Sequence, residues 1–199
     1  MRLTLFLSTF FFFTHYSIGQ NTYSKVFYRS EGGGIFAESF IQRTDGNLLL
    51  VGNTQENLGQ YTLLDANANH LQTVVLDVNS QAGLALNLRN ILPINDSVFL
   101  LSGQYHNAGN GKYEMLAVSI NENGDTLFTS TYANPADADG YTVEGSVRTP
   151  NNHTLLLGTS FIMVYSTMYL LELDDSGQVV WSKKYTQPEA IRPPATLTS

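Results

Sequence analysis

Apolar and polar positions along the chain follow a pattern that recurs three times, with a period of about fifty residues. Each copy opens with turn-forming residues and continues through an apolar run that ends in glycine, at residues 44–52, 94–103 and 150–158. A second landmark follows in each copy, where an apolar run, a tight turn and a more polar run succeed one another at residues 64–77, 120–132 and 173–185. A fixed period of this length indicates a repeat architecture.

Each copy divides into four short runs of strand character. In the first copy these runs are residues 37–42, 47–52, 61–64 and 71–76. Asp45-Gly46 separates the first two runs and predicts a type I′ hairpin turn, because both central residues of that turn need positive φ. Asn95-Asp96 and Asn151-Asn152 stand at the same place in the other copies. Since Asn and Asp tolerate this backbone region, we expect a hairpin there in all three copies.

The apolar runs predict how the strands are buried. Residues 48–51 and 155–157 are continuously apolar, which is typical of strands covered on both faces. The fourth run of each copy is more polar, as in residues 181–185, so we expect it at the outer edge of its sheet. The fold prediction is therefore all-β, with three four-stranded antiparallel repeats of the β-propeller blade type at about residues 37–76, 86–132 and 142–185.

Partial copies stand at both ends of the chain. Residues 23–28 resemble the polar fourth run at 181–185, and such a strand would complete the last blade of a closed ring. Residues 189–199 resemble the start of a fourth copy. Because a propeller needs at least four blades, we expect an incomplete ring and an N-terminal fragment, with the missing blades supplied by the rest of a longer chain. A complete stack of three units is the alternative, but its open strand edges would be templates for pairing.

Residues 1–19 have the pattern of a secretory signal peptide. Met1-Arg2 gives a basic start, an apolar run follows at residues 3–13, and Ser17 and Gly19 suit cleavage before Gln20. The apolar run is shorter than the roughly 20 residues of a membrane-spanning helix, and no later stretch reaches that length. We therefore expect a protein that does not span the membrane, is secreted to the extracellular space, cell surface or periplasm, and has its domain at residues 20–199.

Composition narrows the possible partners and chemistry. The net charge of −7 argues against nucleic acid, whose phosphates attract basic surfaces. The absence of cysteine excludes disulfides and a lipid anchor on cysteine. No serine stands in a G-x-S-x-G elbow, so nucleophilic hydrolase chemistry has no support. We assign no catalytic residue and no cofactor.

Two candidate metal sites fail on their spacing. Residues 65–69 carry oxygen side chains at alternate positions, but His70 and Leu76 stand where an EF-hand calcium loop needs glycine and an acid. An Asx-rich hairpin turn explains the segment better. His70 and His153 are expected at one rim of the sheets and His106 at the other, so the histidines do not converge. We assign no metal site.

The turns and core positions resemble those of secreted β-propeller repeat proteins of the Bacteroidota type. The resemblance rests on the Asp45-Gly46 turn, the apolar run ending in Gly52, and the D-x-x-G turn at residues 174–177 followed by Trp181. It implies a fold and a secreted location, and it implies no particular chemistry. Residues 173–181 are also similar to a repeat of quinoprotein propellers, although only the third copy carries the tryptophan.

Charged residues on the first strand of the repeats are the candidate ligand site. Glu38 and Glu144 occupy similar positions, and Arg43 and Arg148 follow them closely. Arg89 also lies in a first-strand run. Arginine and carboxylate groups around a propeller channel would bind an anionic sugar or a carboxylate through bidentate hydrogen bonds. The alternative is local pairing of these charges at the strand ends.

An apolar segment of the third copy is the candidate partner-binding surface. It consists of Phe161, Ile162, Met163, Val164 and Tyr165. An exposed patch of this kind would bind another protein, whereas a longer hairpin would place these residues in its strands. The functional prediction is a non-catalytic, secreted or cell-surface module that binds a protein or a glycan. The alternative is a polysaccharide-acting hydrolase or lyase that uses acids such as Glu38 and Glu144.

Overall fold

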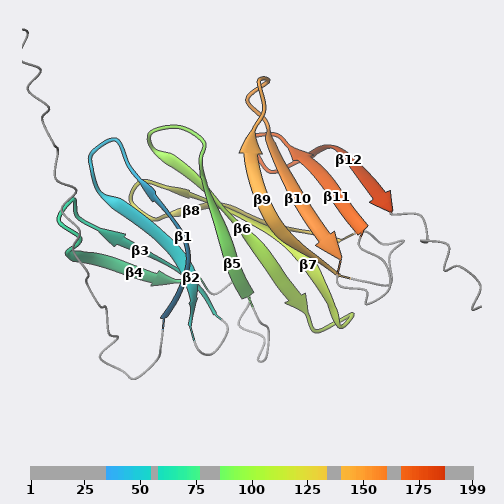
Figure 1. Ribbon diagram of the computed structural model, residues 1–199, viewed down its shortest axis with the longest axis horizontal. Helices are drawn as coiled ribbons and strands as arrows, with labels where there is room; N and C mark the ends of the chain where they lie inside the picture. Colours follow the sequence, from blue (N-terminus) through green and yellow to red (C-terminus); the bar gives the residue numbers. More distant parts are fainter. Residues whose placement is uncertain (1–34, 55–57, 77–85, 134–139, 161–166, 187–199) are drawn as a thin grey trace, which may run out of the picture.

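A computed structural model describes residues 35–54, 58–76, 86–133, 140–160 and 167–186. Within these ranges the chain forms twelve strands in three four-stranded antiparallel sheets and no helix (Figure 1). The described part of the chain thus has no helix long and apolar enough to cross a membrane. The prediction of three four-stranded antiparallel repeats is confirmed. The expected signal peptide, the leading strand at 23–28, the segment 161–165 and the start of a fourth copy at 189–199 lie outside the described residues.

Each sheet is a simple meander in which neighbouring strands follow one another in the chain. The first sheet consists of β1 (Ile35–Gln42), β2 (Leu48–Thr54), β3 (Gly59–Leu64) and β4 (His70–Val75). The second consists of β5 (Leu86–Pro93), β6 (Val98–Asn107), β7 (Lys112–Asn121) and β8 (Thr126–Tyr132). The third consists of β9 (Tyr141–Arg148), β10 (Thr154–Ser160), β11 (Thr167–Leu173) and β12 (Val179–Thr186).

The sheets stack in chain order, with the second sheet between the other two (Figure 1). Strand β5 contacts the first sheet, and β9 contacts β5, β6 and β7. The side chains of β7 alternate between the two junctions, as the period of two in a strand requires. Leu116, Val118 and Ile120 belong to the cluster shared with the first sheet. Met115 and Ala117 belong to the cluster shared with the third.

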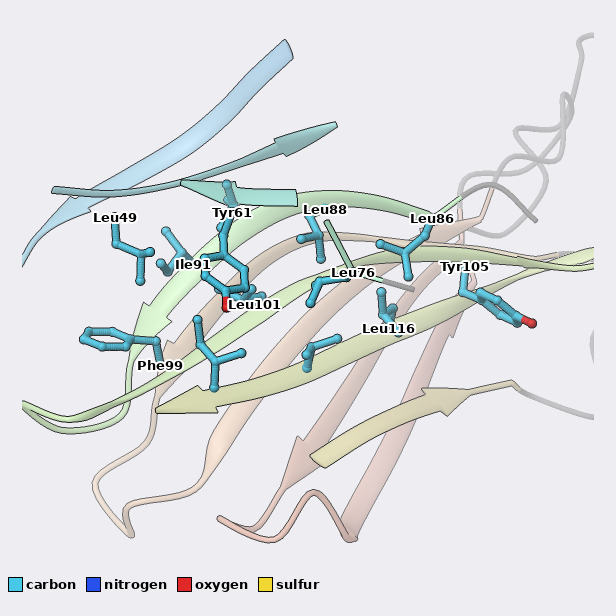
Figure 2. Packing of buried hydrophobic residues seen from close by; sticks show 13 residues of the cluster. Leu49, Tyr61, Leu76, Leu86, Leu88, Ile91, Phe99, Leu101, Tyr105 and Leu116 are labelled. Carbon is cyan, nitrogen blue, oxygen red and sulfur yellow. The ribbon is translucent and has the colours of Figure 1, made fainter. Parts of the chain in front are cut away.

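The cluster between the first two sheets is shown in Figure 2. Leu49 and Tyr61 of the first sheet meet Leu88, Phe99 and other residues of the second, and all four are almost fully buried (Figure 2). In β2, Leu49 and Val51 are buried whereas Leu48 and Leu50 are half-buried. The prediction that this run is equally covered on both faces is therefore wrong in detail. Among the described residues, only the second sheet lies between two others, and its β7 is buried on both faces.

The first hairpin turn differs from the predicted type I′ turn. Gly46 has φ +85, whereas Asp45 is not among the described residues with positive φ. The amide of Gly46 donates to the carbonyl of Arg43 at 3.0 Å, and the amide of Arg43 donates to the carbonyl of Asn47 at 2.8 Å. The turn therefore spans one more residue, with a single left-handed residue at its end. Asn152, with φ +61, repeats this geometry in the third sheet.

The recurring glycine at the end of each apolar run faces a β-bulge. The first strand of each sheet shifts its register at one extra residue, which is Glu38, Arg89 or Glu144. In the first two sheets the bulge brings the first strand's backbone close to the glycine in the neighbouring strand, whereas a Cβ atom on Gly158 of the third sheet would first meet Met115. A Cβ atom on Gly52 would lie 1.9 Å from the carbonyl oxygen of Phe36, and one on Gly103 equally close to that of Asn87. Only glycine fits this close approach.

Candidate functional site

The three bulge residues form the candidate site, and we call Glu38, Arg89 and Glu144 the bulge row. A bulge re-aims the side chain that it carries, which is why bulges are common beside binding sites. Here the same bulge recurs on the first strand of every sheet, and a charged residue fills it each time. The row therefore places a carboxylate, a guanidinium and a second carboxylate on three successive sheets.

An ion pair joins two members of the bulge row across a sheet junction. Nη1 of Arg89 lies 3.3 Å from Oε1 and 3.4 Å from Oε2 of Glu144. The hydroxyl of Thr159 also donates to Oε1 of Glu144, at 3.1 Å. The Arg89 and Glu144 side chains remain 32% and 38% exposed, so solvent reaches both groups. Glu38 is exposed as well.

Polar contacts between sheets hold the strands that carry the row. Oδ1 of Asn53 accepts from the Leu88 amide at 2.8 Å, and Nδ2 of Asn53 donates to the Leu88 carbonyl at 3.2 Å. Gln104 stands at the same place in the second sheet, directly after the recurring glycine, and accepts from the hydroxyl of Thr142. Each amide side chain thus fastens the first strand of the next sheet. Rigid supporting strands suit a binding site because its geometry is set before the ligand arrives.

Arg43 lies at the end of a strand, away from the bulge of its own sheet. Its Nη1 donates to the carbonyl of Glu122 at 3.2 Å, and its Nη2 lies 3.4 Å from the carboxylate of Asp45. Its guanidinium stands 5.6 Å from the centre of the Phe99 ring, and the side chain is only 10% exposed. Arg43 therefore connects the first sheet to a turn of the second.

Arg148 has a corresponding place at the end of β9. Its Nη1 donates to Asp175 at 2.8 Å and to the hydroxyl of Thr154 at 3.3 Å, both within the third sheet. The interactions of Arg43 and Arg148 are those of charges paired at strand ends, which was the alternative to a ring of arginines. The contacts bring Glu144 together with Arg89 instead. The sequence signal for Arg89 was its place in a first-strand run, but the pairing partner 55 residues away left no local trace.

The histidines and the Asx-rich turns have structural partners. Nδ1 of His153 lies 2.8 Å from the carboxylate of Glu172, and the ring of His106 packs on Tyr113. In the turn at residues 65–69, Oδ1 of Asp65 accepts from the amides of Asn67 and Asn69, as an Asx turn requires. Over the described ranges, no group of three or more His, Cys, Asp or Glu side chains is placed to hold a metal ion.

The equivalent turn of the third sheet shifts the pKa of an acidic side chain, Asp174. Oδ1 of Asp174 accepts from the hydroxyl and amide of Ser176 and from the amide of Gln178. The hydroxyl of Ser176, followed by these amides, lowers the pKa of Asp174 below its usual value of 3.8. Asn121 makes the same backbone contacts in the second sheet and has no titrating group. The perturbation is therefore a property of the turn and does not indicate an acid–base catalyst.

Comparison with protein-family models finds no match for this chain, and no curated protein is significantly similar to it in sequence.

Proposed function

We propose that the chain is a secreted β-propeller-type module without catalytic activity, whose bulge row binds a glycan. The observation that carries this proposal is the recurrence of a solvent-accessible charged residue in the same bulge of three successive sheets. A guanidinium and a carboxylate present several hydrogen-bonding groups at fixed angles, which suits a ligand rich in hydroxyl groups. A polar protein surface is the second kind of ligand that the same groups would accept.

Exposed aromatic residues beside Glu38 add to the support for a binding surface. Phe36 and Phe40 flank Glu38 on β1 and are 58% and 68% exposed. Large aromatic side chains combine a wide apolar area with little conformational freedom to lose, which makes them effective contacts in recognition. A ligand at β1 would therefore meet both hydrogen-bonding groups and apolar rings.

A polysaccharide hydrolase or lyase that uses Glu38 and Glu144 is the alternative, and the geometry favours it less. The two acids lie on the first and third sheets, with the second sheet between them. Packed sheets stand about 10 Å apart, so two junctions separate the acids by about 20 Å. The two carboxyl groups of a glycosidase stand only roughly 5 to 10 Å apart.

The proposal is tested by measuring binding and turnover on the same glycan panel. We expect saturable binding without new reducing ends or unsaturated products. Glu38→Gln, Arg89→Gln and Glu144→Gln should each weaken binding about tenfold or more, because hydrogen bonds to charged groups contribute about 1.5–3 kcal/mol. Asp96→Asn is the matched control, since Asp96 is exposed in a hairpin turn outside the bulge row.

Three results would change the conclusion. Turnover that Glu144→Gln abolishes would establish the enzyme instead. Binding that the bulge-row variants leave unchanged would move the site elsewhere. Binding to a protein array with no response on the glycan panel would replace the glycan with a protein ligand.

A further inference from the structure

The sequence contains two Asn-Gly steps, and both lie in exposed turns of the second sheet. Asn110-Gly111 belongs to the turn between β6 and β7, and Asn123-Gly124 to the turn between β7 and β8. Both asparagines are exposed, and the two glycines have φ +70 and φ +87. An asparagine followed by glycine can lose its side-chain amide spontaneously, because glycine has no Cβ to hinder the attack of its backbone nitrogen on the asparagine side chain. The two steps therefore have the same potential chemistry.

The side chain of Asn110 is held at both of its polar atoms. Its Nδ2 donates to Oε1 of Glu114 at 3.2 Å, and its Oδ1 accepts from the amide of Lys112 at 2.9 Å. Glu114 is only 5% exposed, so the first contact ties Asn110 to the body of the sheet. Turning Cγ of Asn110 towards the amide of Gly111 breaks these hydrogen bonds and leaves a buried carboxylate with fewer donors.

The side chain of Asn123 has no such restraint. Within the described part of the chain its side-chain amide makes no hydrogen bond, and only its backbone amide is held, by Oδ1 of Asn121 at 3.0 Å. The attacking nitrogens are alike, because the amide of Gly124 donates to the carbonyl of Asn121 at 3.0 Å and that of Gly111 to the carbonyl of Asn107 at 2.7 Å. The two steps thus differ mainly in the freedom of the asparagine side chain.

The turn that carries Asn123 makes two contacts between the first and second sheets. The hydroxyl of Tyr61 donates to the carbonyl of Gly124 at 2.5 Å, and Nη1 of Arg43 donates to the carbonyl of Glu122 at 3.2 Å. The fit is close, because a Cβ atom on Gly124 would stand 2.4 Å from the hydroxyl of Tyr61. The two acceptor carbonyls belong to the residues on either side of Asn123. Their relative positions therefore depend on the path of the main chain through residue 123.

We infer that Asn123 is a site of spontaneous deamidation, and that its isoaspartate product weakens the contact between the first two sheets. The backbone nitrogen of Gly124 loses its proton and bonds to Cγ of Asn123, while the bond from Cγ to Nδ2 breaks and ammonia leaves. Water then opens the resulting succinimide ring at either carbonyl, which gives aspartate or isoaspartate. No electron is transferred, and water is the only co-reactant.

Isoaspartate changes the turn because its main chain runs through Cβ and Cγ and is longer than that of asparagine. The carbonyls of Glu122 and Gly124 then no longer keep the spacing that Arg43 and Tyr61 require. The new carboxylate also stands between the acidic side chains of Glu122 and Asp125. The inference concerns the junction of the sheets and does not depend on a ligand at the bulge row.

The site is tested by incubating the full chain in warm, mildly alkaline buffer, followed by trypsin digestion and mass spectrometry with fragmentation. Trypsin cleaves after lysine and arginine, so residues 90–112 and 113–148 report the two Asn-Gly steps in separate peptides. We expect deamidation at Asn123 to be several-fold faster than at Asn110, and Asn123→Gln to abolish it. Incubation in guanidinium chloride is the control. Unfolding releases both side chains and should make the two rates similar.

Urea unfolding of the incubated chain tests the effect on the sheets. Its midpoint should fall as isoaspartate accumulates, whereas Asn123→Gln incubated in the same way should keep its midpoint. Fresh Asn123→Asp should change the midpoint little, because it adds the charge at an exposed position without lengthening the main chain. In Tyr61→Phe the fall on incubation should be smaller, since one contact with the turn is already missing.

Two results would overturn the inference. Equal rates at the two steps in the folded chain, or a faster reaction at Asn110, would contradict Asn123 as the preferred site. An unchanged midpoint in a chain shown to carry isoaspartate at residue 123 would contradict its effect on the junction.

Discussion

The second and third sheets are built from the same repeat, yet their strands have very different surroundings. Every side chain from Met115 to Ile120 in β7 is buried, whereas β11 buries only Thr167 and the residues from Leu171 to Leu173 and leaves Met168 half exposed. The difference lies in the neighbouring sheets. Among the described residues, the second sheet packs against a sheet on each side, whereas the third sheet packs against the second alone. An apolar strand residue thus identifies a surface that can be covered, and the adjacent sheet decides whether it is.

The largest expected difference between the two sheets is at their equivalent methionines. Met115→Ala should lower the free energy of unfolding by about 2–5 kcal/mol, because it leaves a cavity in the packed junction. Met168→Ala should change it by only about 0.5–1 kcal/mol, because solvent already reaches this side chain. Urea denaturation followed by far-UV circular dichroism measures both. Equal losses would mean that the face of the third sheet that carries Met168 is already covered in solution.

The recurring glycines should give the next largest difference. In the second sheet, Gly103→Ala would put a Cβ atom 1.9 Å from a backbone carbonyl, which cannot move without disturbing the bulge. In the third, a Cβ atom on Gly158 would meet Sδ of Met115 at 2.8 Å, and a flexible side chain can shift.

We expect Gly103→Ala to cost about 1–3 kcal/mol or more in denaturant unfolding, and Gly158→Ala less. The reverse order would mean that the bulge of the second sheet adapts more easily than the packing around Met115.

The two equivalent tyrosines should differ by about one hydrogen bond. Tyr132→Phe removes the donor to Gly177 at a half-buried position and should cost about 0.5–1.5 kcal/mol of unfolding free energy. Tyr185→Phe should be nearly neutral, because Tyr185 is exposed. Burial raises the pKa of Tyr132, and the charge of Asp174 raises it further. Burial also raises the pKa of Tyr61. A spectrophotometric titration should therefore show phenols that ionise above the usual pKa of 10.0, and Tyr132→Phe should remove one of them.

The smallest expected effect is a difference in acid sensitivity between two turns. The folded-state pKa of Asp174 is lowered, so its contribution to stability is present above the usual value of 3.8 and is lost as the pH falls through the lowered pKa. Asp174→Asn should therefore flatten the pH dependence of unfolding below about pH 4.

The double variant Asn121→Asp with Asp125→Asn in the second sheet is the converse change, and it should add acid sensitivity to this turn. The second substitution is needed because Nδ2 of Asn121 donates to the carboxylate of Asp125 at 2.9 Å, so an aspartate at position 121 alone would face a second carboxylate. The measurement is the urea midpoint at a series of pH values. No change in slope for either variant would mean that these turn contacts do not persist in solution.

Much of the architecture could be predicted because it depends on local patterns. The apolar runs ending in glycine and the polar fourth strands correctly gave three four-stranded sheets, with strand ends within one or two residues in the first. The prediction of a type I′ turn was wrong because Asp45-Gly46 also suits a longer turn with one left-handed residue. Choosing between them depends on the register of the strands as well as on the pair itself.

The candidate site could be predicted only in part. Glu38 and Glu144 were selected from their equivalent places in the first-strand runs, and both occupy bulges. The partners of Arg43 and Arg148 depend on which turn lies next to each strand end. No feature of the local sequence determines those contacts, because Arg43 reaches Glu122 across the junction of two sheets and Arg148 reaches Asp175 across the strands of its own sheet.

The hydrogen bonds that Asn53 and Gln104 form between sheets have a consequence for how such a chain changes in evolution. The second repeat carries both an amide side chain, on Gln104, that contacts the first strand of its successor and a first strand that Asn53 of its predecessor contacts. A gene segment of one repeat length therefore encodes both halves of the joint. Recombination between repeats can lengthen or shorten the array without inventing a new interface.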